Sequence, residues 1–292
     1  QEVEQMNLFK DMVCYQEEVR DPSRMAEVLN RVIEKAFRGS APAQINVPRD
    51  YWTQVIDIEL PPIVRFERQG GGKEAIENAA KLLSKAKFPV ILSGAGVVLG
   101  GAIDECKKLA EKLDAPVCNG YQHNDSFPGS HPLAVGPLGY NGSKAAMELI
   151  SKADVVLALG TRLNPFSTLP GYGIDYWPKK ATIIQVDMNP DRIGLTKKVS
   201  VGICGDAKQV AQQILDKLSS DAGNTGREER KNLIHKTKSA WLQTLSGLDH
   251  EEDDPGTVWN KEARERDKDR MSPRQAWSCL LYTSDAADDS LR

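Results

Sequence analysis

Between residues 73 and 217 the chain alternates helical patterns with short segments that are almost entirely apolar. Segments such as PVILSG, DVVLALG and ATIIQVD look like parallel strands that are covered on both faces of a sheet. Alternation of such strands with helices predicts a doubly wound, mostly parallel α/β sheet. The spacing predicts helices over 73–86, 101–113, 143–151 and 206–218, and strands over 89–93, 116–119, 154–159, 181–187 and 199–203.

The region before this alternation predicts the end of another α/β unit. Residues 22–38 place apolar side chains on one helical face, and Gly39 is expected to end the helix. The segment AQINVPRD then predicts a short strand. Residues 51–72 hold paired prolines and three consecutive glycines without a sustained period, so they predict a linker. The apolar helical face consists of Met25, Val28, Leu29, Val32, Ile33 and Ala36.

The region after the alternation is polar and charged. Residues 219–270 predict a charged linker that contains one amphipathic helix. Its apolar face consists of Leu233, Ile234, the aliphatic stem of Lys238, Trp241 and Leu245. At 271–277, Ser272 and Pro273 are typical of the start of a further helix. Residues 278–292 break that pattern and resemble a translated adapter sequence, so we expect a non-native tail there.

The composition excludes several classes of protein. With 38 basic and 41 acidic residues, the net charge is -3, which argues against a nucleic-acid binder. No apolar run has the length of a membrane span. The five cysteines are scattered and the four histidines lack metal-ligand spacing, so we expect free thiols, a cytoplasmic protein and no metal site within this chain.

Two glycines follow the first strand of the alternation. Gly94 and Gly96 lie in SGAGVVLGG, whose spacing departs from the dinucleotide fingerprint GxGxxG. The functional interpretation is a turn that places a pyrophosphate at a helix N-terminus. The structural interpretation is a tight corner that lets the helix pack close to the strand. The spacing favours the corner.

Polar groups also follow two later strands. Gly160, Thr161 and Arg162 end one strand, where a guanidinium could meet a ligand or a local carboxylate. Asp187 ends the next strand, where a carboxylate could bind a ribose or cap a turn. We therefore take Gly94, Gly96, Gly160, Thr161, Arg162 and Asp187 as candidate cofactor-binding residues.

The segment over residues 118–142 holds His123, Asp125 and His131 but no nucleophile elbow, so we expect a polar loop rather than a catalytic dyad. The chain also lacks a P-loop and a zinc signature. From the residues alone, it is a soluble α/β ligand-binding domain with pieces of two neighbouring domains, and no catalytic residue can be assigned.

The order of the motifs resembles the thiamine diphosphate-dependent decarboxylase and acetohydroxyacid synthase superfamily. The resemblance rests on QINVPRDYW, GGGKEAIENAAKLLSKAKFPVILSGAGV, HPLAVGPLGYNGSKAAMELISKADVVLALGTRLNPF, IIQVDMNPDRIG and VSVGICGDAKQV. It implies that residues 1–50 end a pyrimidine-binding domain, 73–218 form the central domain, and 271–277 begin a diphosphate-binding domain.

The resemblance also implies the cofactors. Thiamine diphosphate and Mg²⁺ would be bound by the full-length enzyme, with the activating glutamate upstream of Gln1 and the GDG…N segment downstream of the tail. Gln1 matches a glutamine near the cofactor cleft of the family and is the one residue carried over to that site. The chain alone is expected to be inactive. In some relatives the central domain carries FAD or ADP.

Within the superfamily, QEVEQMNLFKDMVCYQEEVRDP and NPFSTLPGYGIDYWP are most similar to the acyltransferases of sulfonate metabolism. These enzymes convert sulfoacetaldehyde and phosphate into acetyl phosphate and sulfite. The alternatives are an acetolactate synthase-like enzyme, an oxalyl-CoA decarboxylase-like enzyme, and a non-catalytic nucleotide-binding module. The family also implies a homodimer or homotetramer.

Overall fold

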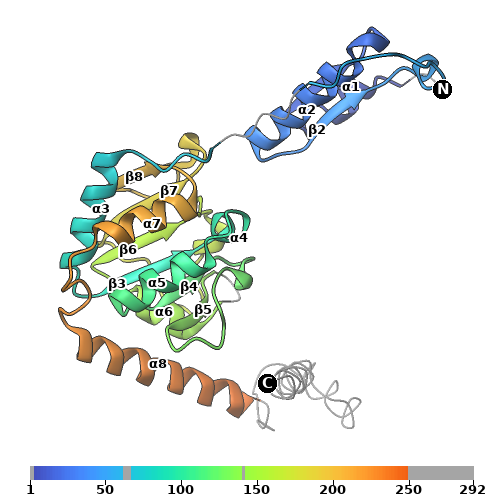
Figure 1. Cartoon of the computed structure of the whole chain (residues 1–292). Helices are drawn as coiled ribbons and strands as arrows, with labels where there is room; N and C mark the ends of the chain where they lie inside the picture. The colour runs from blue at the N-terminus through green and yellow to red at the C-terminus, as the bar shows by residue number, and fades with distance from the viewer. Residues whose placement is uncertain (1–2, 62–66, 140–141, 249–292) are drawn as a thin grey trace, which may run out of the picture. The chain divides into compact units, whose positions relative to one another are not determined.

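The computed structural model describes residues 3–61, 67–139 and 142–248. These divide into two compact units, Gln1–Glu67 and Arg68–Arg292 (Figure 1). Gln1 and the segments 249–270, 271–277 and 278–292 of the sequence prediction lie outside the described residues. The first unit contains α1 (Gln5–Phe9), β1 (Tyr15–Glu18), α2 (Met25–Gly39) and β2 (Ala43–Asn46), with 3-10 helices at Pro22–Arg24 and Arg49–Tyr51.

In the first unit, α2 connects the parallel strands β1 and β2. Val28 and Val32 of α2 are buried, whereas Leu29 and Ile33 are 42% and 45% exposed. The predicted apolar face therefore packs only in part within the described residues. The helix also runs through Gly39, and the left-handed residue that ends it is Ser40 (φ 45°), so the prediction for Gly39 was wrong by one residue.

The reason for glycine at position 39 is a close approach to Cys14. A Cβ on Gly39 would lie 3.1 Å from the Cys14 Sγ, a distance that few side chains tolerate. The glycine therefore allows α2 to pack near the residue that precedes β1.

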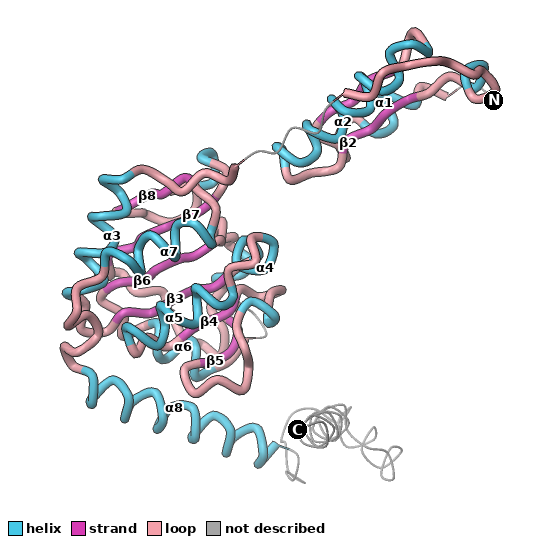
Figure 2. The backbone as a smooth tube through the Cα atoms, in the orientation of Figure 1, coloured by secondary structure: helices cyan, strands magenta, loops and turns pink. Residues whose placement is uncertain are grey.

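The second unit is built on one six-stranded sheet in which every pair is parallel. Its strands are β3 (Pro89–Ser93), β4 (Val117–Asn119), β5 (Ala134–Pro137), β6 (Val155–Leu159), β7 (Thr182–Asp187) and β8 (Val201–Cys204). Its helices are α3 (Lys73–Lys85), α4 (Ala95–Leu99), α5 (Ile103–Leu113), α6 (Lys144–Ile150), α7 (Ala207–Lys217) and α8 (Arg227–Leu248). Figure 2 shows the strands side by side with helices on their flanks.

The strand order in the sheet is β5-β4-β3-β6-β7-β8. The chain first winds outward from β3 to β5 and then returns to the other side of β3 with β6. This is the doubly wound arrangement that the alternation predicts, and its winding direction reverses between β3 and β6.

Helices cover both faces of the sheet. On one face, Ile91, Leu157 and Ile184 belong to a core with residues of α3, α5 and α7. On the other face, Val90 and Val156 belong to a second core with residues of α6 and with Ile234 of α8. Because both faces are buried, every residue of β3 and β6 is buried, which explains their continuous apolar character.

One strand and one α-helix of the second unit differ from the sequence prediction. Residues 134–137 form the edge strand β5, where we expected a polar loop. Gly136 has φ 91°, and the pairing register between β4 and β5 shifts next to it. An edge strand tolerates such irregularities. Because of them, the local sequence does not show a strand pattern. Residues 95–99 form the short helix α4, which Gly101 (φ 63°) separates from α5.

Candidate functional site

The carboxyl ends of β3 and β6 form the candidate site, because ligands of open α/β sheets bind where the winding direction reverses. Gly94 directly follows β3, and Gly160 directly follows β6. β7 lies next to β6, and Gly160 N donates a hydrogen bond to Val186 O at 3.0 Å. Asp187, the last residue of β7, therefore lies at the same edge as the two glycine motifs.

The two glycine motifs pack directly against each other. Gly94 N donates to Leu159 O at 3.0 Å, and Gly96 N donates to Gly160 O at 2.8 Å. A Cβ on Gly96 would lie 2.7 Å from Gly160 Cα, and a Cβ on Gly94 would lie 2.6 Å from Thr161 Cβ. The N–H groups of Gly94 and Gly96 thus bond to protein, and the absence of side chains lets the two backbones meet.

Thr161 and Arg162 differ in their surroundings. Thr161 Oγ1 accepts from Leu163 N at 3.2 Å, and Thr161 O accepts from Gln185 Nε2 at 3.1 Å. Arg162 is exposed, and within the described part of the chain no carboxylate forms an ion pair with it. The local ion pair considered for Arg162 is therefore not formed by these residues, and its guanidinium faces solvent.

Asp187 makes a turn contact. Its Oδ1 accepts from Asn189 N at 2.8 Å, and the residue is 8% exposed. The next residues continue this arrangement, since Asn189 Oδ1 accepts from Asp191 N at 2.9 Å. One carboxylate oxygen of Asp187 is thus used in shaping the turn after β7.

A buried polar network lies at the ends of β3 and β4 and was missed in the sequence. Asn119 Nδ2 donates to Ser126 Oγ at 3.0 Å, and Ser93 Oγ donates to Ser126 O at 3.1 Å. All three residues are at most 4% exposed. The signal that could have revealed the network is a polar residue, Ser93 or Asn119, at the end of an otherwise apolar strand.

The histidines of residues 118–142 do not form a common site. His123 Nδ1 lies 3.9 Å from Asp125 Oδ1, and both side chains are well exposed. His131 Nε2 lies instead 3.2 Å from Glu111 Oε1 on α5. The two histidines of this segment therefore contact different carboxylates, one within the segment and one on α5.

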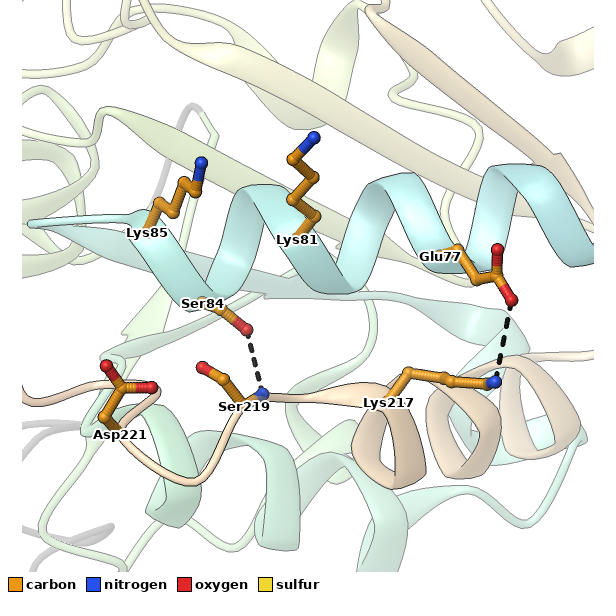
Figure 3. Close-up of a pocket in the computed structure, with 7 residues that line it drawn as sticks. All are labelled: Glu77, Lys81, Ser84, Lys85, Lys217, Ser219 and Asp221. Atoms are coloured by element: carbon orange, nitrogen blue, oxygen red, sulfur yellow. Dashed lines mark hydrogen bonds and ion pairs between the residues drawn. The ribbon is translucent and has the colours of Figure 1, made fainter.

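An open pocket lies at the opposite end of the sheet, where α3 and α7 end (Figure 3). Lys217 Nζ lies 3.6 Å from Glu77 Oε1, and Ser219 N donates to Ser84 Oγ at 3.1 Å. Basic residues at helix C-termini interact favourably with the helix dipole. The polar and basic residues at this pocket therefore have a structural role at the ends of α3 and α7. The pocket is lined by Glu77, Lys81, Ser84, Lys85, Lys217, Ser219 and Asp221.

Within residues 3–61, 67–139 and 142–248, no three His, Cys, Asp or Glu side chains come together as metal ligands would. None of the helices in the same ranges combines the length and the apolar character needed to cross a membrane.

Comparison with known proteins places these features in context. Residues 76–214 match the family model "Thiamine pyrophosphate enzyme, central domain". Over 280 residues the chain is 77% identical to the probable sulfoacetaldehyde acetyltransferase of Rhizobium meliloti (strain 1021). The alignment covers 96% of this chain and 47% of that protein. It is 76% identical over 280 residues to the sulfoacetaldehyde acetyltransferase of Roseovarius nubinhibens, with 96% of this chain and 46% of that protein covered.

More distant relatives carry other names. A probable acetolactate synthase large subunit of Methanocaldococcus jannaschii is 33% identical over 256 residues, covering 85% of this chain and 41% of that protein. A benzoylformate decarboxylase structure from Polynucleobacter necessarius has a TM-score of 0.65 and 23% identity, covering 77% of this chain and 42% of that one, and shares the fold. The chain spans about half the length of the curated relatives it matches.

Proposed function

Residues 76–214 are a central domain of the thiamine pyrophosphate enzyme family, and from this premise we propose that the chain belongs to a sulfoacetaldehyde acetyltransferase. The reaction joins the acetyl unit of sulfoacetaldehyde to phosphate and releases sulfite. The observation that carries the proposal is the 77% identity over 280 residues to a relative of that name, against 33% to an acetolactate synthase relative.

The described residues fit a supporting role in this reaction. We assign neither Mg²⁺ nor the diphosphate of the cofactor to them, because the GDG…N segment with which the family holds both groups does not occur in this chain. Thiamine diphosphate supplies carbanion chemistry when bound, and the protein supplies orientation and electrostatics. Apart from Gln1, which the family resemblance carries over to the cofactor cleft, we place the binding of Mg²⁺ and thiamine diphosphate in the part of the longer relatives that this chain does not span.

For the candidate site, we propose that Gly94, Gly96 and Gly160 form a structural corner. The support is that the N–H groups of Gly94 and Gly96 already donate to Leu159 O and Gly160 O. A pyrophosphate at this turn would need N–H groups that point to it. Thr161 and Asp187 likewise use polar atoms in local turns.

A bound nucleotide is the competing possibility at this edge, and Arg162 is the observation that favours it. Its exposed guanidinium has no ion pair among the described residues and could bind phosphate. Acid extraction of the purified protein, followed by chromatography for FAD and ADP, distinguishes the structural corner from a nucleotide site. A stoichiometric nucleotide that is lost in Arg162→Ala would contradict the corner proposal.

The activity is tested on the uninterrupted reading frame from which this chain comes. With thiamine diphosphate and Mg²⁺, we expect sulfoacetaldehyde and phosphate to yield equal amounts of acetyl phosphate and sulfite. Pyruvate and oxalyl-CoA serve as competing substrates for the two related activities. Turnover of pyruvate to acetolactate without acetyl phosphate formation would reject the proposal in favour of the synthase.

The 292-residue chain itself provides a second measurement. We expect it to form no acetyl phosphate, because the family residues that activate the cofactor and bind the metal are not found in it. Turnover by this chain would show that the assignment of the catalytic groups to other parts of the protein is wrong. We further propose that the full protein is cytoplasmic and forms a homodimer or homotetramer. Light scattering on the purified enzyme tests the oligomeric state.

A further inference from the structure

Helix α8 (Arg227–Leu248) is polar along most of its length, yet it contacts the central domain at several separate places. In Figure 1 it runs as one long helix along the margin of the second unit. Its contacts begin near the amino ends of the strands and reach the loop that follows β6. This course connects α8 to the candidate site.

The first contact is made by Arg230, which is 1% exposed. Its guanidinium donates hydrogen bonds of 2.5 to 2.9 Å to five main-chain carbonyl oxygens. These belong to Lys87, Leu113, Asp114, Gly223 and Thr225. Because the acceptors come from the start of β3, the end of α5 and the segment before α8, one side chain fixes the beginning of the helix to the domain.

The middle of α8 also contacts the domain. Ile234 is 4% exposed and belongs to the second core. One turn later, Lys238 Nζ donates to Pro132 O at 2.8 Å, in the segment that leads to β5. These contacts hold the middle of the helix against the second core and the segment before β5.

The far contact is an aromatic pair. The Trp241 ring lies against the Tyr172 ring, with 5.6 Å between centroids and an interplanar angle of 66°. The Tyr172 hydroxyl donates to Gly142 O at 3.0 Å. Tyr172 belongs to residues 160–173, the loop that begins with Gly160, Thr161 and Arg162.

Tyr172 needs such contacts because its backbone is strained. It has φ 53°, Gly173 has φ 70°, and Ile174 N donates to Gly171 O at 2.9 Å, so residues 171–174 form a turn of type I′. Glycine, asparagine and aspartate favour the left-handed position, and a bulky residue there costs free energy that surrounding contacts must offset. The Trp241 ring and the Gly142 carbonyl supply those contacts.

We propose that α8 positions the loop of residues 160–173: Arg230 fixes the start of the helix, and Trp241 holds Tyr172 in its left-handed turn. The loop that carries Thr161 and Arg162 is then held at both ends. Gly96 contacts Gly160 at its start, and Trp241 of α8 contacts Tyr172 near its end. The proposal concerns the conformation of the loop and does not depend on the reaction proposed above.

Hydrogen–deuterium exchange of the whole 292-residue chain, read by mass spectrometry, tests the proposal. In Trp241→Ala, we expect exchange of peptides from residues 164–173 to accelerate roughly three- to tenfold, the range that corresponds to loss of an aromatic pair. Peptides from β3 and β6 should keep their rates. The matched control is Leu242→Ala, since Leu242 lies on the same helix and is 61% exposed.

Equal exchange of the loop in Trp241→Ala and Leu242→Ala would overturn the proposal. Should Trp241→Ala fail to fold, Tyr172→Asn takes its place, because asparagine accepts the left-handed conformation but loses the ring and the hydroxyl. We expect the same faster exchange in that variant. An unchanged rate there would show that the turn holds the loop without α8.

Discussion

At the scale of single residues, contacts between distant positions explain why glycine and paired charges occur where they do. Gly96 and Gly160 belong to different sequence motifs but meet at the reversal point of the sheet. In the first unit, Arg31 on α2 donates to both carboxylate oxygens of Glu17 on β1, at 2.7 and 2.8 Å. Each of these contacts joins two elements that are separated in the chain, and the local sequence does not predict it.

Substitution of Gly96 tests the close approach at the corner. Gly96→Ala places a Cβ 2.7 Å from Gly160 Cα, and backbone cannot move aside as a flexible side chain can. We expect the free energy of unfolding in urea to fall by about 2 to 3 kcal/mol. Gly129→Ala is the control, because a Cβ there meets nothing within 4 Å and should leave stability unchanged or slightly raised.

The ion pair in the first unit predicts an acid-sensitive contact. Hydrogen bonds from Arg31 and then from Tyr15 lower the pKa of Glu17 from 4.5 to about 2. Since the folded pKa is depressed, the contact stabilises fully above pH 4.5 and is lost as the pH falls toward 2. In Arg31→Met, carboxyl NMR titration should return the pKa of Glu17 toward 4.5.

The control for that titration is Arg38→Met, because Arg38 pairs with Glu34 on the same helix rather than with Glu17. We expect this variant to leave the pKa of Glu17 near 2. A Glu17 pKa that stays low in Arg31→Met would mean that another group stabilises the carboxylate.

At the scale of elements, the second unit shows how burial and edge position govern what the pattern reveals. The strands of the sheet other than β5 are mostly apolar, and their predicted and observed bounds agree within two residues. The edge strand β5 contains Gly136 and Pro137 and was missed. Helix α8 was predicted from its apolar side chains, but the residue most buried on it is Arg230.

Arg230 is expected to be the residue on which attachment of α8 depends most. Arg230→Ala leaves five carbonyl oxygens without their donor, and we expect a loss of about 3 kcal/mol in urea unfolding. Arg230→Lys keeps the charge but has fewer donors, so it should restore only part of the loss. The exposed residue Lys236 on the same helix, changed to Ala, is the control. Wild-type stability in Arg230→Lys would contradict a role for the five-donor geometry.

At the scale of the whole molecule, the two units differ greatly in their cores. The second unit has two extensive cores, one on each face of the sheet. In the first unit, the described core of fully buried apolar residues consists of Val19, Val28 and Val32. The first residues of the second unit are bonded to Asp206. Arg68 Nη1 lies 2.9 Å from Asp206 Oδ2, and Asp206 N donates a hydrogen bond to Gln69 O.

We therefore expect residues 68–248 to fold alone. Expressed by themselves, they should unfold cooperatively in urea with the midpoint that the 292-residue chain shows for its sheet, because both cores lie within them. Circular dichroism of the two proteins makes the comparison. A lower midpoint or a gradual transition in the shorter protein would show that residues outside 68–248 contribute to the stability of the sheet.

The sequence by itself determined the class of the fold and most elements of the second unit, because strands buried on both faces and helices buried on one leave a local, periodic record. Its resemblance to thiamine diphosphate enzymes, also legible in the motifs, agrees with the family match over residues 76–214. Only the tertiary structure decided that Gly96 meets Gly160, that residues 134–137 add an edge strand, and that Arg230 is buried. The physical reason is that these features depend on contacts between residues far apart in the chain, which local periodicity does not encode.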